Sequence, residues 1–231
     1  MRPYRHLLFD LDHTLWDYDS NVRDSLTELY AQHRLAELGT ATFEVFFEAF
    51  QATNLELWDQ FNQGQVDRDQ LRAIRFPKVF TRARLSEALI PRSLEDDFIR
   101  LTSSKAKVMD QAMEMLQYLG ETYELHIVTN GFNESQYAKL KASGLDRHFK
   151  VVVTSESSGF RKPDRRIFAH TLQEIGTLPH ECLMIGDNPT SDILGAKNAS
   201  IDQVHFNPRG LQSPVPATFT IRHLSELKSF L

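Results

Sequence analysis

The chain has 231 residues, of which 41% are hydrophobic and 25% are charged, so it can bury a substantial core and is not compositionally disordered. Its 26 basic and 31 acidic residues give a formal net charge of −5 without a long basic run, which argues against a nucleic acid polymer or an anionic membrane as partner. The single cysteine, Cys182, precludes an internal disulfide, and no apolar run approaches the ~20 residues that span a bilayer. Because the N-terminus also lacks a signal peptide pattern, we expect a cytoplasmic protein. We expect either a monomer or a homodimer.

The first predicted strand is followed directly by acidic residues. The apolar run Leu7-Leu8-Phe9 predicts a buried strand, and side chains on extended backbone alternate, so Asp10, Asp12 and Thr14 are expected to leave it on one side. Two carboxylates at one place need a cation or a proton, and Mg²⁺ is usually held by one or two carboxylates together with substrate phosphate oxygens. The segment therefore indicates a phosphate-handling metal site, with an acidic surface turn as the alternative.

Residues 18–103 show helical periodicity without a strand-like run. The clearest pattern is an apolar stripe, whose members recur at three- and four-residue steps and so share one helix face. The stripe comprises Phe43, Phe46, Phe47, Phe50, Leu57, Trp58 and Phe61. A preceding helix is expected over about residues 21–38, and Gly64 and Asp67 predict the end of the striped helix and the N-cap of the next one. We expect a helical bundle inserted after the first strand.

Beyond Lys105, predicted helices and apolar strands alternate. The strands are expected at residues 125–128, 151–153, 183–185 and 204–206, and the helices over about residues 109–121, 134–143, 165–175 and 191–198. Near-continuous apolar strands joined by helices are typical of a parallel sheet covered on both faces, which predicts a doubly wound α/β domain. In such sheets ligands bind beyond the carboxyl ends of the strands, near the point where the strand order reverses.

Polar residues follow the later predicted strands at these carboxyl ends. Thr129-Asn130-Gly131 supplies a hydroxyl and a turn whose backbone N–H groups can face an anion. Lys162 follows the third strand, and Asp187 and Asp192 follow the fourth. Each has a structural alternative: a common turn, a solvated lysine, or a carboxylate favoured near a helix N-terminus. Their order at successive strand ends favours a phosphoryl-transfer site.

These four segments resemble the four motifs of the haloacid dehalogenase-like (HAD) hydrolase superfamily. The resemblance is carried by Asp10-x-Asp12-x-Thr14, Thr129, Lys162 and Gly186-Asp187-x4-Asp192. Further residues are similar to the pyrimidine 5′-nucleotidase subfamily, namely Asn54, Leu57-Trp58, Gly64, Leu71, Arg75-Phe76 and Val128-Thr129-Asn130-Gly131-Phe132. The resemblance covers the whole chain and implies a HAD-like α/β core over residues 1–17 and 104–231, with an inserted all-helical cap over residues 18–103.

The resemblance implies a phosphatase that hydrolyses small phosphomonoesters through an aspartyl-phosphate intermediate, with a pyrimidine nucleoside 5′-monophosphate as the expected substrate. Asp10 is the implied nucleophile, because a carboxylate is ionised at neutral pH and can form an acyl-phosphate. Asp12 is the implied general acid and base, a task that favours a pKa raised by its neighbours.

The resemblance also implies a set of ligands. The implied Mg²⁺ ligands are Asp10, the backbone carbonyl of Asp12, and Asp187, with Asp192 orienting the waters of the metal. The groups implied to bind the non-bridging phosphate oxygens are Thr129, the backbone of Asn130, and Lys162. Trp16 and Asp17 are expected to line the mouth of the site, whereas His13 is expected to face outward or to pack. The other histidines show no ligand-like spacing.

Competing functions remain open at this point. A HAD phosphatase for another small substrate, such as a sugar phosphate, is one alternative, and a catalytically inactive binding module is another from a different class. A dehalogenase of this fold would have no use for an acid at position 12, because halide leaves without a proton. Asp12 therefore favours phosphate esters.

Overall fold

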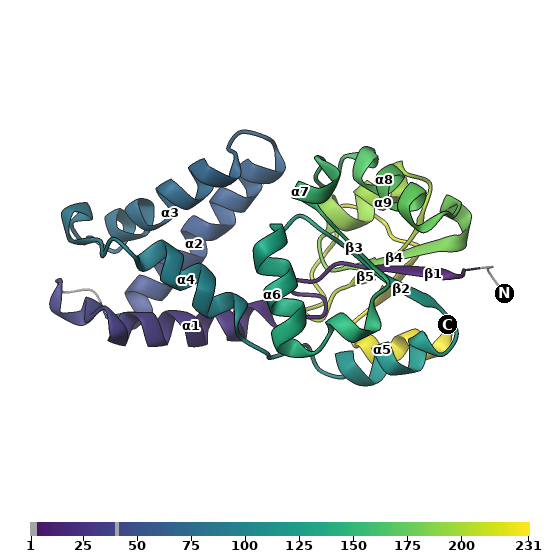
Figure 1. Ribbon diagram of the computed structural model, residues 1–231, viewed down its shortest axis with the longest axis horizontal. Helices are drawn as coiled ribbons and strands as arrows, with labels where there is room; N and C mark the ends of the chain where they lie inside the picture. The colour runs from purple at the N-terminus through teal and green to yellow at the C-terminus, as the bar shows by residue number, and fades with distance from the viewer. Residues whose placement is uncertain (1–3, 40–41) are drawn as a thin grey trace. The chain divides into compact units, whose positions relative to one another are not determined.

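The computed structural model describes residues 4–39 and 42–231, so residues 1–3 at the start of the predicted core lie outside the described residues. The chain divides into two compact units. The first, the α/β unit, comprises the residues up to Tyr18 together with Ala106–Leu231, and the second, the helical unit, comprises Asp19–Lys105 (Figure 1). Among the described residues, no helix combines the length and the apolar character needed to cross a membrane.

The α/β unit is built on a parallel sheet with the strand order β3-β2-β1-β4-β5-β6. The strands are β1 (His6–Phe9), β2 (Glu124–Thr129), β3 (Val151–Thr154), β4 (Cys182–Gly186), β5 (Asp202–Phe206) and β6 (Phe219–Ile221). The strand order reverses between β1 and β4, which is the position where open α/β sheets bind ligands. The predicted doubly wound α/β fold is confirmed.

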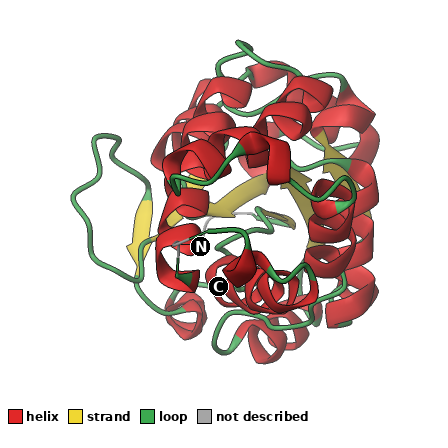
Figure 2. Ribbon diagram, turned by 90° about the vertical axis from the view of Figure 1, so that its left-hand side faces the viewer, coloured by secondary structure: helices red, strands yellow, loops and turns green. Residues whose placement is uncertain are grey.

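Apolar side chains on both faces of the sheet explain why these segments form buried strands. On β1, Leu7 and Phe9 belong to the core on one face, whereas Leu8 belongs to the core on the other face. The first face is covered by α5 (Ala112–Gly120), and the second face is covered by α8 (Arg165–Ile175) and α9 (Gly195–Asn198). In Figure 1, α5 lies on one side of the sheet, and α8 and α9 lie together on the other side. Figure 2 shows the yellow strands among the red helices.

The remaining helices of the α/β unit follow the strands of the sheet. They are α6 (Asn133–Ser143), η3 (Asp146–His148), α7 (Ser155–Ser158), η4 (Pro179–Glu181), the π-helix η5 (Pro189–Leu194) and η6 (Leu224–Ser229). Helix α8 begins at the N-cap Asp164, whose side chain accepts a hydrogen bond from the N–H of Arg166, and it ends at Gly176 in the left-handed conformation.

The helical unit has an aromatic core. Its elements are α1 (Tyr18–Gln32), η1 (Leu35–Glu37), α2 (Phe43–Asn62), α3 (Arg68–Arg82), η2 (Glu87–Leu89) and α4 (Leu94–Ser103). The predicted stripe on α2 is largely buried, and its Phe50 ring lies 4.9 Å from the Phe98 ring, centroid to centroid. Asp67 is the N-cap of helix α3, as the sequence predicts, and it forms a capping box with Gln70. The aromatic stripe therefore forms the bundle core.

Some element boundaries differ from the sequence-based prediction. The helix expected over residues 21–38 ends at Gln32, because Arg34 adopts a left-handed backbone with φ 52° and a short 3₁₀ helix follows. The helix expected from residue 109 begins at Ala112, because Gln111 is also left-handed, with φ 60°. Strand β6 was not predicted, since its three residues, Phe-Thr-Ile, are too few to show a pattern.

Candidate active site

Three carboxylates meet where the strand order reverses. Asp10 follows β1, and its N–H donates to the carbonyl of Ile185 on β4 at 2.9 Å, which continues the pairing of the two strands beyond the end of β1. Asp187 follows β4 directly, and Asp192 lies on η5. One oxygen from each of these carboxylates lies within 4.8 Å of the others. The sheet thus brings together residues that are up to 182 positions apart in the chain, from Asp10 to Asp192.

Hydrogen bonds hold Asp187 and Asp192 in this cluster. The hydroxyl of Thr14 donates to Asp187 Oδ1 at 3.2 Å, and the ring of His205 donates through Nε2 to the Asp187 carbonyl at 3.1 Å. Asp192 accepts from the N–H of Asn188 at 2.9 Å. The side chain of Asp187 is therefore held by Thr14, and its backbone carbonyl is held by His205 on β5.

Gly186 allows Asp192 to approach the end of β4. A Cβ atom at this position would lie 2.4 Å from Asp192 Oδ2, well inside the contact distance of real side chains. The residue that precedes Asp187 must therefore lack a side chain if Asp192 is to reach the cluster.

Lys162 contacts two of the three carboxylates and is 1% exposed. Its ammonium donates to Asp10 Oδ1 at 2.5 Å, to Asp192 Oδ1 at 2.7 Å and to the carbonyl of Val128 at 2.7 Å. A lysine ammonium has three donors, so all of them are engaged. Burial lowers the pKa of Lys162, but the adjacent charges of Asp10 and Asp192 outweigh burial and raise it, which keeps the ammonium charged.

The cluster has more negative than positive charge. Burial raises the pKa of Asp10 to about 7 against the opposing effect of Lys162, with a further increase from Asp192. The pKa of Asp187 also lies well above its usual range, because burial raises it and the negative charges of Asp192 and Asp10 raise it further. Three carboxylates and one ammonium leave an excess of two negative charges when all are ionised. A divalent cation with oxygen ligands fits this donor set.

The carboxylate of Asp12 lies outside the three-carboxylate cluster. Strand β1 ends at Phe9 and His13 adopts a left-handed backbone with φ 64°, so the expected alternation of Asp10, Asp12 and Thr14 does not continue. Asp12 instead accepts hydrogen bonds from Lys139 at 2.7 Å and from Gln136 at 2.9 Å, both on α6. Thr14 does contact the cluster, because its hydroxyl donates a hydrogen bond to Asp187.

The expectation that neighbours raise the pKa of Asp12 is wrong. Burial by itself raises this pKa, but the charge of Lys139 and the hydrogen bonds from Lys139 and Gln136 outweigh burial and lower it. Asp12 is therefore ionised at neutral pH in this arrangement.

The Thr129-Asn130-Gly131 segment is braced from two sides. Thr129 Oγ1 accepts from Gln136 Nε2 at 2.7 Å and from the N–H of Gly131 at 3.1 Å. The Asn130 side chain accepts from the N–H of Lys162 at 2.7 Å and donates to its carbonyl at 2.9 Å. A Cβ atom on Gly131 would lie 2.1 Å from Gln136 Nε2, so this glycine makes room for the glutamine. The segment links the phosphate-binding candidates to Asp12 through Gln136.

Gln136 and Lys139 are the site residues that the sequence reasoning missed. They lie one turn apart on α6, the helix that begins just after the predicted turn at Asn130-Gly131. Their spacing of three residues, which places side chains on one helix face, is the signal that could have found them. The Lys139 ammonium also lies 4.6 Å from the centroid of the Trp16 ring, a cation–π distance.

The residues beside Asp12 differ in how well they were predicted. Trp16 is 0% exposed, so the expectation that it lines the mouth of the site is wrong, and its ring instead packs beside Lys139. Asp17 pairs with Lys107 at 3.5 Å. His13 packs against Tyr18 with ring centroids 4.5 Å apart, which confirms its predicted packing role.

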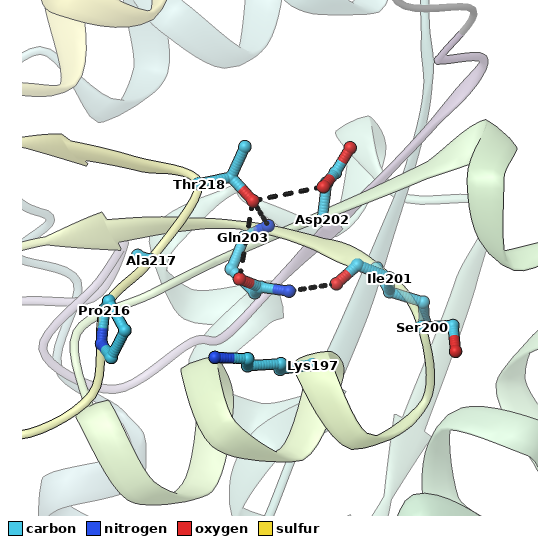
Figure 3. Close-up of a pocket in the computed structure, with 8 residues that line it drawn as sticks. All are labelled: Lys197, Ser200, Ile201, Asp202, Gln203, Pro216, Ala217 and Thr218. Atoms are coloured by element: carbon cyan, nitrogen blue, oxygen red, sulfur yellow. Dashed lines mark hydrogen bonds between the residues drawn. The ribbon is translucent and has the colours of Figure 1, made fainter.

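A separate surface hollow lies at the other end of the sheet. Its lining includes Lys197 of α9, Asp202 and Gln203 of β5, and Thr218 (Figure 3). The Thr218 hydroxyl donates to Asp202 at 3.1 Å and accepts from the Gln203 N–H at 3.2 Å, so the polar groups bond to one another. Because Asp202 begins β5, the hollow lies at the amino ends of the strands, away from Asp10.

Comparison with known proteins agrees with this geometry. A family model for haloacid dehalogenase-like hydrolases matches residues 4–200. The chain is 31% identical to YfnB of Bacillus subtilis over 237 residues, which covers 100% of this chain and 97% of YfnB. The structure is also similar to the crystal structure of YfnB bound to magnesium, with a TM-score of 0.88 at 30% identity over 99% of this chain and 98% of that chain.

Two further relatives are named pyrimidine 5′-nucleotidases. PynA of Streptococcus pneumoniae is 32% identical, with 93% of this chain and 88% of PynA covered. YjjG of Escherichia coli is 30% identical, with 97% of this chain and 96% of YjjG covered. These findings confirm the predicted resemblance and the predicted class of enzyme, a hydrolase. The chain belongs to the haloacid dehalogenase-like hydrolase family.

Proposed function

We propose that this hydrolase is a Mg²⁺-dependent phosphatase of small phosphomonoesters, with a pyrimidine nucleoside 5′-monophosphate as its preferred substrate. The observation that carries the proposal is the cluster of Asp10, Asp187 and Asp192 against Lys162, with its excess negative charge. The substrate class is supported by two relatives, PynA and YjjG, that are named pyrimidine 5′-nucleotidases.

The donor set supports Mg²⁺ as the resident ion. Asp10, Asp187 and the backbone carbonyl of Asp12 would hold the metal, since carboxylate and carbonyl oxygens are the ligands that Mg²⁺ prefers. Both oxygens of Asp192 already accept hydrogen bonds, from Lys162 and from the Asn188 N–H, which supports an outer role that orients metal-bound water. When bound, the ion supplies positive charge that offsets the charge of the phosphate.

Asp10 is the proposed nucleophile. Its carboxylate attacks phosphorus and forms an aspartyl-phosphate while the ester oxygen of the substrate departs. The Lys162 hydrogen bond fixes the orientation of Asp10 and favours its ionised form. A bound divalent cation would favour that form further, against the burial that raises the pKa of Asp10 to about 7. Water then attacks the phosphoryl group, which releases phosphate and restores the Asp10 carboxylate.

Asp12 is the proposed general acid and base. It gives a proton to the departing ester oxygen and later takes one from the attacking water. Lys139 and Gln136 hold its carboxylate ionised, which suits the second step. A phosphate dianion nearby disfavours a second negative charge, so substrate binding would raise the pKa of Asp12 toward the protonated form that the first step needs.

Thr129, the backbone of Asn130 and Lys162 are the proposed phosphate-binding groups. Lys162 can contact a phosphate oxygen directly only if it exchanges one of its three present hydrogen bonds, because its donors are all engaged. We therefore propose that Lys162 acts on the phosphate chiefly through its charge and through its hold on Asp10.

The helical unit is the proposed cap. In this proposal residues 1–17 and 104–231 form the catalytic core, and residues 18–103 form a cap that selects among small phosphate esters. The crystal structure of YfnB bound to magnesium reveals interdomain movement in that protein, which supports the proposal of a cap that can move in this chain.

A substrate panel tests the proposal. Purified protein with Mg²⁺ is assayed for phosphate release from pyrimidine and purine nucleoside monophosphates and from hexose phosphates, with the Asp10→Asn variant as the inactive control. We expect the pyrimidine monophosphates to give the highest kcat/KM. Hexose phosphates ranking first would overturn the substrate class, and absence of phosphate release from every ester would favour a binding module.

A further inference from the structure

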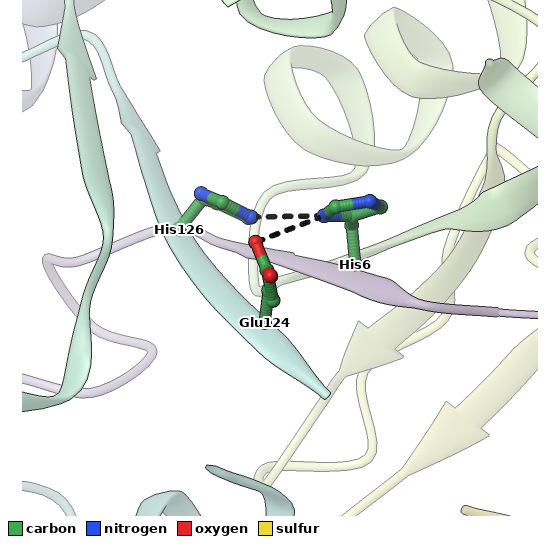
Figure 4. Close-up of side chains that lie close together, drawn as sticks. All are labelled: His6, Glu124 and His126. Atoms are coloured by element: carbon green, nitrogen blue, oxygen red, sulfur yellow. Dashed lines mark hydrogen bonds and ion pairs between the residues drawn. The ribbon is translucent and has the colours of Figure 1, made fainter. Parts of the chain in front are cut away.

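Two histidines and a glutamate meet at the amino ends of β1 and β2. In the parallel register His6 lies opposite Glu124, and Leu8 lies opposite His126, so the three polar side chains share one face of the sheet. His6 Nδ1 lies 3.2 Å from His126 Nε2 and 3.9 Å from Glu124 Oε2 (Figure 4). One ligand atom from each lies within 4.8 Å of the other two. The three groups thus converge on one point.

These separations suit a small divalent metal ion. Two nitrogens bound to tetrahedral zinc at 2.0–2.1 Å are ~3.3 Å apart, as follows from that bond length. The observed separation between His6 Nδ1 and His126 Nε2 is 3.2 Å. Glu124 Oε2 lies 3.9 Å from His6 Nδ1, so it must move inward by about 0.6 Å to reach the ligand separation of a tetrahedral ion. The Glu124 side chain is 56% exposed, which leaves it room for this adjustment.

We propose that His6, Glu124 and His126 form a binding site for Zn²⁺ or a similar transition metal ion. Imidazole nitrogen suits zinc, copper and nickel, whereas magnesium prefers oxygen ligands, so this site and the carboxylate cluster differ in the metal they select. His126 is 1% exposed and anchors the site in the sheet, whereas the side chains of His6 and Glu124 are 13% and 56% exposed. The site therefore reaches the surface on the Glu124 side, where water could supply a fourth ligand.

The proposed site is separate from the phosphatase centre. His6 and Asp10 are four residues apart along the same strand direction, which corresponds to about 13 Å at 3.3 Å per residue. One site lies at the amino end of β1 and the other beyond its carboxyl end. A metal at the amino end would join β1 to β2 without contacting the reacting groups.

A zinc titration of the full-length protein tests the proposal. Zn²⁺ binding is measured by calorimetry in saturating Mg²⁺, and Co²⁺ absorption gives an independent readout of ligand geometry. We expect the parent chain to bind one equivalent of Zn²⁺ at this site. Replacement of a ligand in His6→Gln, Glu124→Gln or His126→Gln should weaken binding by at least ~100-fold, since loss of even an outer partner costs about 10–100-fold. Phosphatase activity in Mg²⁺ should be unchanged in these variants.

Two variants serve as matched controls. His170 pairs with Glu174 at 3.4 Å on the surface of α8. His170→Gln therefore removes a histidine that lies near a carboxylate but outside the proposed zinc site. Cys182→Ser removes the thiol, which lies opposite His6 on β4 and whose pKa burial raises to about 12. Both controls should bind Zn²⁺ like the parent chain.

Three outcomes would overturn the proposal. The first is that the parent chain binds no zinc under these conditions. The second is that zinc binding survives His6→Gln and Glu124→Gln, two variants near the surface that are expected to fold. The third is that zinc binding is lost in Asp187→Asn but retained in the ligand variants, which would assign the ion to the carboxylate cluster.

Discussion

The ammonium of Lys139 donates a 2.7 Å hydrogen bond to the carboxylate of Asp12. Lys139 is therefore the cation that keeps Asp12 ionised, and it comes from α6, not from any of the four strand ends. The candidate acid and base of the site thus depends on a residue outside the family motifs quoted above.

Lys139→Met tests this dependence. Because Lys139 lowers the pKa of Asp12, its loss should raise that pKa and move the limb of the pH–kcat profile that Asp12 governs to higher pH. We expect kcat to fall by about 10- to 100-fold, less than the 10²–10⁴-fold typical of losing general acid–base catalysis. Steady-state kinetics across pH provide the measurement, with Lys141→Met as a control on the exposed side of the same helix. An unchanged profile in Lys139→Met would contradict this role.

Gly186→Ala tests the close approach of Asp192. The added Cβ would lie 2.4 Å from Asp192 Oδ2, so Asp192 or the end of β4 must shift, at a cost of about 1–3 kcal/mol of folding free energy. We expect phosphatase activity to fall sharply and Mg²⁺ to bind more weakly.

Gly120→Ala is the matched control for this substitution. A Cβ on Gly120, the last residue of α5, would meet Leu125 at 3.9 Å, which is an ordinary contact. Unfolding experiments should show equal or higher stability with full activity. Equal activity in both alanine variants would argue against the proposed role of Asp192.

Glu95 in the helical unit gives a prediction about pH and stability. Burial raises the pKa of Glu95, and the charges of Arg75 and Arg72 offset this only partly; the Arg75 guanidinium lies 3.7 Å away. The folded state therefore holds the Glu95 proton more tightly than the unfolded chain does. This contribution is fully present below the unfolded pKa of about 4.3 and is lost as pH rises through the higher folded pKa.

The Glu95→Gln variant cannot ionise, so it should lose this contribution to the pH dependence. The free energy of unfolding of the parent chain, relative to Glu95→Gln, should fall as pH rises above about 4.3, by up to 1.4 kcal/mol per pH unit. Urea unfolding at several pH values gives the measurement. Glu87→Gln, at an exposed position, should keep the slope of the parent chain. If the free energy of unfolding of the parent chain, relative to Glu95→Gln, instead rose with pH, the folded state would favour the ionised form of Glu95, which would contradict this prediction.

Metal removal tests the carboxylate cluster by stability alone. A ligand that binds only the folded state stabilises it by mass action, by about 2.7 kcal/mol at a concentration of 100 times Kd. We expect Mg²⁺ to raise the Tm of the parent chain and of Asp110→Asn, which changes an exposed carboxylate. Asp187→Asn should show no such increase. The same increase in Asp187→Asn would exclude Asp187 from the metal site.

Periodicity predicted the sheet and the carboxyl ends where polar residues gather. A parallel sheet brings those ends to one edge, so Asp10, Lys162 and Asp187 could be expected to meet from their order alone. The orientation of Asp12 could not be predicted, because it depends on the left-handed backbone at His13 just beyond β1. Sequence alternation applies only while the strand continues.

Local sequence patterns also could not predict which side chains meet across neighbouring strands. His6 and His126 are separated by 120 positions, so no ligand-like spacing reveals them, and only the register of β1 with β2 brings them together. Lys139 is similar, because a helix sequence indicates which residues share a face but not which neighbour that face contacts.

The aspartyl-phosphate mechanism is tested most directly by locating the phosphoryl group on the enzyme during turnover. A radiolabelled phosphomonoester is mixed with enzyme and Mg²⁺, the reaction is quenched in acid, and the acyl-phosphate is reduced with borohydride and mapped by mass spectrometry. We expect modification of Asp10 in the parent chain and none in Asp10→Asn. A phosphorylated residue elsewhere, or full turnover in Asp10→Asn, would contradict it.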